Sequence, residues 1–155
     1  MHTHNLHFYD STNPGNIPSG VAAAIPVDGK FVWNPRDVRR MSAVIGYTVE
    51  GQVAKARVAR AIDIEPGCVW PPENAIPFLR ERHRLNHDAT AYADRSNMPT
   101  VRALCQRAGI PILEWVATLD GTQDVEGAWA VQYQGGIRAP FDVSVVHGID
   151  NFHRR

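Results

Sequence analysis

Eight short apolar runs rich in β-favouring residues recur along this chain of 155 residues, and they constrain its fold more than any other feature. Polar or helix-forming segments separate most of these runs. Several runs are apolar at nearly every position rather than at alternate positions, which is typical of strands covered on both faces. The runs span residues 6–10, 21–27, 43–49, 58–64, 89–94, 111–118, 128–133 and 141–146.

Three segments between the runs carry helix-start signals. Asn34 and Pro35 have the residue types preferred at an N-cap and at the first helical position. A second helix is expected after Pro71. A third is expected after Asn97, and Gly109 supplies its stop signal.

Strands that alternate with helices predict a parallel sheet, and eight strands predict a closed α/β barrel of the (β/α)8 TIM-like type. A complete barrel of this type takes about 250 residues, with about 200 at the lower end. We therefore expect a trimmed barrel with several crossover helices shortened or missing, in one domain over residues 1–155. The short connections are expected between Val49 and Val58 and after Thr118 and Tyr133. A smaller open α/β sheet is the competing architecture.

Composition and charge exclude several classes of partner. The 16 basic and 16 acidic side chains cancel, so no broad basic surface for nucleic acid is expected. No stretch approaches the roughly 20 apolar residues that cross a bilayer, and the start MHTHNLHFYD lacks the pattern of a signal peptide. We expect synthesis in the cytoplasm, no membrane partner, and two reduced thiols at Cys68 and Cys105.

Polar and aromatic residues gather at the strand ends, where parallel barrels place their active sites. Carboxylates beside aromatic rings are typical of a sugar-cleaving site, because acids protonate the leaving oxygen and rings contact sugar faces. Single acids at strand ends also serve as turns and caps. The residues at these ends are Asp10, Tyr47, Asp63, Glu65, Tyr92, Asp94, Glu114, Trp115, Trp129, Gln132 and Tyr133, with Asp142 at the beginning of its run.

The segment AIDIEPG places two carboxylates, Asp63 and Glu65, two residues apart at the end of an apolar run. In a strand, such residues project to the same side. Burial and a neighbouring negative charge would raise the pKa of one of the two carboxyls, so that it stays a proton donor near neutral pH. The alternative is a solvated strand end with no catalytic role.

The order of these residues resembles the glycoside hydrolase family 25 lysozymes and related glycoside-hydrolase-like proteins of actinobacteria and their phages. In those lysozymes strand one ends in Asp, strand four carries Asp-x-Glu, strand seven closes with a Trp-Gln-Tyr-like signature, and strand eight brings another Asp. The counterparts here are Asp10 in FYDS, Asp63 and Glu65 in AIDIEPG, Trp129, Gln132 and Tyr133 in WAVQY, and Asp142 in FDVSVV.

The resemblance implies a role for each matching residue. Glu65 would be the general acid, and Asp63 would stabilise developing positive charge or orient the substrate's acetamido group. Asp10 and Asp142 would hold the network. Sugar platforms would come from Tyr47, Tyr92, Trp115 and Tyr133, with Gln132 as a polar contact. No metal and no cofactor is expected.

The leading hypothesis is a lysozyme-type glycosidase (muramidase) that cleaves β-1,4 bonds of peptidoglycan or a related glycan. A phage lysin, or a virion-associated protein that contacts other virion proteins or is released by lysis, would fit this hypothesis. The short chain and the altered pattern FYDSTNPG motivate a second hypothesis, a non-catalytic virion or glycan-binding protein with a glycosidase-like barrel. A third is a small α/β enzyme acting on another polar substrate.

Overall fold

The computed structural model describes residues 6–147, and the expectation of a single domain also covers residues 1–5 and 148–155, which lie outside the described part. All eight predicted strands are present in it, each within a few residues of its expected bounds. They are β1 (Leu6–Asp10), β2 (Ala22–Pro26), β3 (Ala43–Thr48), β4 (Ala61–Asp63), β5 (Thr90–Asp94), β6 (Leu113–Ala117), β7 (Ala130–Gln134) and β8 (Asp142–Val146).

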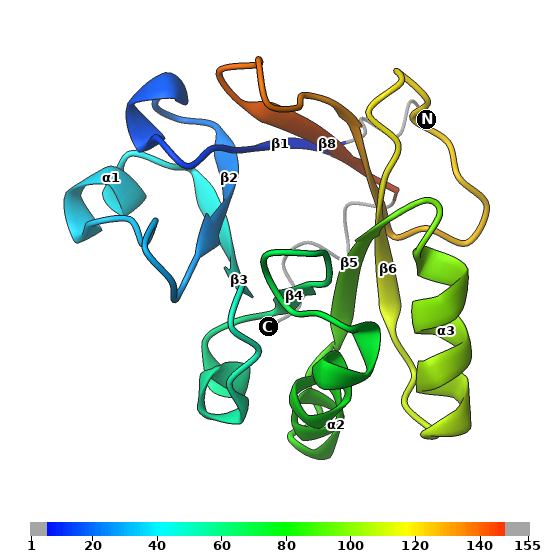
Figure 1. Cartoon of the computed structure of the whole chain (residues 1–155). Helices are drawn as coiled ribbons and strands as arrows, with labels where there is room; N and C mark the ends of the chain where they lie inside the picture. Colours follow the sequence, from blue (N-terminus) through cyan, green and yellow to red (C-terminus); the bar gives the residue numbers. More distant parts are fainter. Residues whose placement is uncertain (1–5, 148–155) are drawn as a thin grey trace, which may run out of the picture.

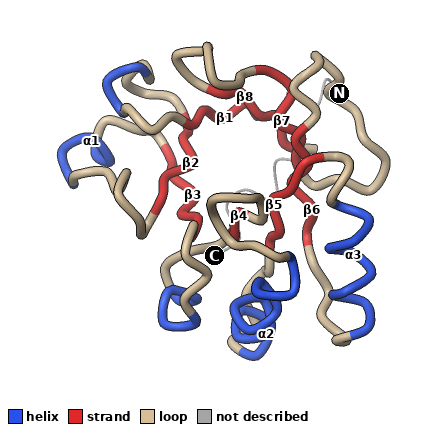
Figure 2. The backbone as a smooth tube through the Cα atoms, viewed as in Figure 1, coloured by secondary structure: helices blue, strands red, loops and turns tan. Residues whose placement is uncertain are grey.

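The strands close into a barrel in chain order, with β8 pairing to β1 (Figure 2). The expectation of an open sheet is therefore wrong. Neighbouring strands are parallel from β1 to β7, but β8 runs antiparallel to both β7 and β1, so a fully parallel sheet was also wrong. The cause is the short link of residues 135–141 between β7 and β8. A parallel crossover needs a dozen or more residues, whereas antiparallel neighbours can follow a tight turn.

Helices surround only part of the barrel (Figures 1 and 2). The α-helices are α1 (Pro35–Arg39), α2 (Ile76–Arg84) and α3 (Met98–Arg107), and the short 3-10 helices are η1 (Pro14–Asn16), η2 (Val53–Arg57) and η3 (Pro72–Ala75). As predicted, three connections lack a full crossover helix: only the short 3-10 helix η2 links β3 to β4, and within the described chain no helix links β6 to β7 or β7 to β8. No helix in residues 6–147 has the length and apolar character to cross a membrane.

Alternation along the strands divides side chains between the barrel interior and its outer layer. The interior is filled by aromatic rings, with Phe8 5.1 Å from Trp115 and the Arg60 guanidinium 4.6 Å from the Trp129 ring. Outward positions of β4 and β5 pack against α2 and α3 in a separate apolar cluster. Because the interior below is filled, inward residues at the C-terminal ends of the strands border the open mouth.

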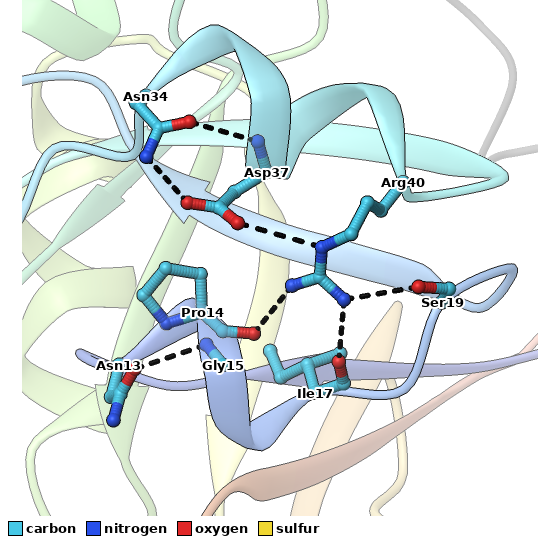
Figure 3. A network of polar contacts seen from close by, with 8 residues as sticks. All are labelled: Asn13, Pro14, Gly15, Ile17, Ser19, Asn34, Asp37 and Arg40. Atoms are coloured by element: carbon cyan, nitrogen blue, oxygen red, sulfur yellow. Dashed lines mark hydrogen bonds and ion pairs between the residues drawn. The ribbon is translucent and has the colours of Figure 1, made fainter.

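Arg40, which follows α1, ties the loop between β1 and β2 to the rest of the barrel (Figure 3). Its guanidinium donates to the carbonyl of Pro14 at 2.8 Å, the carbonyl of Ile17 at 3.1 Å and the hydroxyl of Ser19 at 3.1 Å. Asp37 lies 3.5 Å from its Nε. Because this loop begins directly after β1, the network fixes the path of the chain beside the barrel mouth.

Replacing Arg40 with Met should lower the free energy of unfolding by about 1 to 2 kcal/mol, because the carbonyls it binds lose a charged donor. Urea denaturation measures this change. Arg39→Met is the matched control, since Arg39 is exposed on the same helix, and it should change stability by less than about 0.5 kcal/mol. Equal loss in both variants would contradict the structural role of Arg40.

Candidate active site

A pocket of about 650 Å³ opens at the C-terminal ends of the parallel strands, and all four predicted carboxyl residues line it. Asp10 comes from the end of β1, Asp63 from the end of β4, and Glu65 from the turn that follows β4. Asp142 is the first residue of β8. The pocket volume lies within the range of small-ligand sites, about 300–1,000 Å³.

Asp142 reaches this mouth because β8 runs in the reverse direction. In the β1–β8 register Asp10 lies directly opposite Asp142. The turn before β8 also fits closely around the Asp142 carboxylate, since the backbone N–H of Gly136 donates to its Oδ1 at 2.8 Å. A Cβ at Gly135, where φ is +141°, would lie 1.7 Å from the same oxygen. Only glycine therefore allows this approach.

The side chain of Gln132, on β7, binds the two facing carboxyls of Asp10 and Asp142. Its side-chain Nε2 donates to Asp10 Oδ2 at 3.1 Å and to Asp142 Oδ2 at 3.4 Å, and its Oε1 accepts from the hydroxyl of Tyr92 at 2.8 Å. The Gln132 side chain is buried, so its orientation is fixed by these bonds. Burial raises the pKa of Asp10 well above its usual range, and the nearby Asp142 charge raises it further.

A tight turn after β4 builds the second carboxyl group of the site. The N–H of Cys68 donates to the carbonyl of Glu65 at 3.0 Å, with Gly67 at φ +92° and Pro66 before it, as in a type II turn. This turn brings Cys68 Sγ to 3.9 Å from Glu65 Oε1. The N–H of Val69 then donates to the Asp63 carbonyl at 3.1 Å. The segment AIDIEPG is thus a strand end folded back over the pocket.

Both carboxyls of this group bind protons more tightly than ordinary ones. Burial, followed by the nearby Glu65 charge, raises the pKa of Asp63 to about 8. Burial also raises the pKa of Glu65, although hydrogen bonds from Asp63 and Cys68 lower it in part. The sequence interpretation assigned the proton to Glu65 with Asp63 charged beside it. In the structure Asp63 is the more deeply buried of the two, and its pKa of about 8 favours its protonated form near neutral pH.

The predicted aromatic platforms occupy three different positions. Tyr47 and Tyr92 line the pocket. Trp115 forms its floor, only 3% exposed, and its ring supports Tyr92 at 4.8 Å while its Nε1 donates to Ser144 at 3.0 Å. The Tyr133 ring lies 6.0 Å from His7, and Tyr133 is not among the lining residues of this pocket.

The structure therefore does not bring Tyr133 into this pocket with the other predicted aromatic residues. Tyr133 lies where the β7–β8 register shifts between Gln132 and Gln134, and such an irregularity interrupts the regular alternation of side chains.

Sequence reasoning missed part of the pocket wall. The segment from Asp28 to Phe31, which follows β2, lines the pocket together with Thr12 and Glu50. Cys68 was interpreted only as a structural thiol, and it is a free thiol as predicted. The sequence carries a signal for the β2 segment, because the polar residues DGK directly follow an apolar run, just as polar residues do at the other strand ends.

Asp63, Glu65 and Cys68 are the described residues that come closest to a metal-ligand group, with one potential ligand atom from each lying within 4.8 Å of the others. Metal binding requires deprotonated ligands. Burial raises the pKa of the Cys68 thiol to about 12 and that of Asp63 to about 8. A metal ion that bound here would therefore have to displace protons from Asp63 and Cys68.

Comparisons with protein-family models, with curated proteins and with solved structures found no match to this chain.

The raised pKa of Asp63 predicts a pH-dependent stability. Between about pH 4, where an unfolded Asp ionises, and pH 8 the folded chain keeps a proton that the unfolded chain has lost. The free energy of unfolding should therefore fall as the pH rises through this window. Asp63→Asn cannot ionise, so its stability relative to wild type should increase by about 1 kcal/mol per pH unit.

Urea denaturation at pH 5, 7 and 9 measures this difference. Asp124→Asn, at an exposed position between β6 and β7, is the control and should keep the wild-type dependence. A constant difference between Asp63→Asn and wild type over the three pH values would contradict the burial of a protonated Asp63.

Proposed function

We propose that this protein is a lysozyme-type glycosidase, a muramidase that cleaves β-1,4 bonds in the glycan strands of peptidoglycan. The observation that carries the proposal is the meeting of Asp10, Asp63, Glu65 and Asp142 in one pocket bordered by tyrosine rings. Glycosidases use paired carboxyls around an oxocarbenium-like transition state. The resemblance to glycoside hydrolase family 25 assigns chemistry to the same four residues.

We also propose that the barrel is a trimmed (β/α)8 TIM-like barrel. Its closed ring of eight strands, the parallel pairing from β1 to β7 and the pocket at the C-terminal strand ends support this relation. The missing crossover helices and the reversed β8 are the ways in which it would be shortened.

In the proposed mechanism Glu65 protonates the glycosidic oxygen. The hydrogen-bonded pair of Asp63 and Glu65 supplies the proton, which Asp63 holds before the substrate binds. When an acetamido N–H of the substrate binds Asp63, the charged form of Asp63 is favoured and the proton passes to Glu65. Asp63 is then a carboxylate that orients the acetamido group, whose oxygen attacks the anomeric carbon as the leaving oxygen accepts the proton.

The second carboxyl pair sets the electrostatics of this step. Burial and the nearby Asp142 charge raise the pKa of Asp10, which favours its neutral form and lowers the negative charge of the pair. The negative charge that remains stabilises the positive charge that develops on the sugar ring. The lower total charge also reduces the repulsion with Asp63 and Glu65 in the same pocket. The hydrogen bonds of Gln132 fix the positions of both carboxyls and of the Tyr92 hydroxyl relative to one another.

A wall-degrading role suits a phage lysin or a virion-associated protein, whose partners would be peptidoglycan and neighbouring virion proteins. Within the pocket, Tyr47 and Tyr92 would contact the sugar faces, and Trp115 would keep Tyr92 in place from below.

Glu65→Gln should abolish the release of reducing sugar from purified peptidoglycan, with a loss of at least about 100-fold, because the amide cannot donate the required proton. The expected change in stability is small, since Glu65 is only partly buried. Glu126→Gln, on the exposed loop before β7, is the control and should retain full activity.

Full turnover by Glu65→Gln would remove the assignment of the acid. Wild-type protein that binds peptidoglycan without cleaving it would instead support the non-catalytic glycan-binding hypothesis.

A further inference from the structure

The loop after β2 gives one edge of the pocket a different chemical character from the rest. Lys30 and Phe31 are both exposed and both line the pocket, and 46% of Phe31 remains accessible to solvent. The Lys30 ammonium lies 5.1 Å from the centre of the Phe31 ring, within the range of a cation–π contact. The two side chains thus form a cationic and apolar pair on the rim, the Lys30–Phe31 pair.

The base of this loop is held in place from below. Asp28, which is only 7% exposed, accepts hydrogen bonds from the Thr48 hydroxyl and from the N–H of Val49 at 2.8 Å. Gly29 follows at φ +77°, and a Cβ there would lie 2.6 Å from a methyl group of Val49. A buried carboxylate anchor and an obligatory glycine therefore fix where the loop emerges.

Charge makes Lys30 unusual among the residues around the pocket. It is the only basic side chain in the lining of this pocket, whose other charged residues are the acids Asp10, Asp28, Glu50, Asp63, Glu65 and Asp142. Within residues 6–147 no carboxylate lies in ion-pair distance of Lys30. An anionic group on a bound ligand would be repelled by most of the pocket and attracted at this edge.

We propose that the Lys30–Phe31 pair recognises a carboxylate of the peptide that is attached to the peptidoglycan sugar through its lactyl ether. This inference rests on the proposed function and adds the feature that selects the substrate. The Lys30 ammonium binds the carboxylate, and the Phe31 ring packs on the apolar face of the same sugar or side chain. The pair thereby favours peptidoglycan over an uncharged glycan of similar backbone.

The test compares two ligands that differ only in charge: a tetrasaccharide–peptide fragment of peptidoglycan, and the same fragment with its carboxyl groups amidated. Binding is measured by calorimetry in the Glu65→Gln background, where turnover cannot interfere. Adding Lys30→Gln should weaken binding of the charged fragment by about ten-fold and that of the amidated fragment by less than two-fold. Lys30→Arg should bind the charged fragment with most of the wild-type affinity, and Phe31→Ala should weaken the binding of both fragments.

Lys55→Gln, at a lysine that does not line the pocket, is the matched control and should leave both affinities unchanged. Equal effects of Lys30→Gln on the two fragments, or no effect on either, would overturn the inference. Turnover by the Glu65-containing protein is scored separately. If it fails to cleave peptidoglycan while the charge-dependent loss at Lys30 persists, the proposed catalysis fails and the recognition by Lys30 stands.

Discussion

The antiparallel pairing of β8 with β1 is the constraint on which the site depends. It closes the barrel and, through its register, sets Asp10 directly opposite Asp142. If β8 ran parallel to its neighbours, Asp142 would begin the strand at the opposite end of the barrel, roughly 13 Å away at 3.3 Å per residue. Two glycines in the preceding turn make the reversal compatible with a backbone that closely surrounds the Asp142 carboxylate.

Closure of the barrel brings several carboxyl groups close together, and protonation of some of them reduces the repulsion between their charges. Four carboxyls converge on one partly buried pocket, and burial disfavours the charged forms of Asp10, Asp63 and Glu65. The structure groups the four as Asp10 with Asp142 and Asp63 with Glu65, and the raised pKa values of Asp10 and Asp63 reduce the negative charge within each pair. The Gln132 amide stabilises one pair, and the Cys68 thiol lies against the other.

Sequence patterns predicted the strands and most of the site because those features depend on local rules. Apolar runs located all eight strands, and strand ends identified the four carboxyls. The direction of β8 required knowledge of which strand it would pair with, which no local pattern carries. The position of Tyr133 could not be predicted either, because it depends on a register shift in β7 between Gln132 and Gln134 that the motif does not reveal.

The order of proton affinities also could not be predicted, since it depends on how deeply each carboxyl is buried. Asp63 and Glu65 look equivalent in sequence, but only Glu65 lies on the turn beyond the strand. The β2 loop was not predicted as part of the site, although Lys30 and Phe31 follow an apolar run as the predicted site residues do.

The pairing of the first strand with the last has a kinetic consequence. Contacts between β1 and β8 join residues more than 130 positions apart, for example Tyr9 with Val143, so they cost more loop-closure entropy than other strand pairs and form late in folding. During synthesis the ribosome releases β8 after β1 to β7, and until then Asp10 lacks its partner Asp142. We therefore expect the carboxyl cluster to be the last part of the barrel mouth to assemble, because its two halves meet only when β8 pairs with β1.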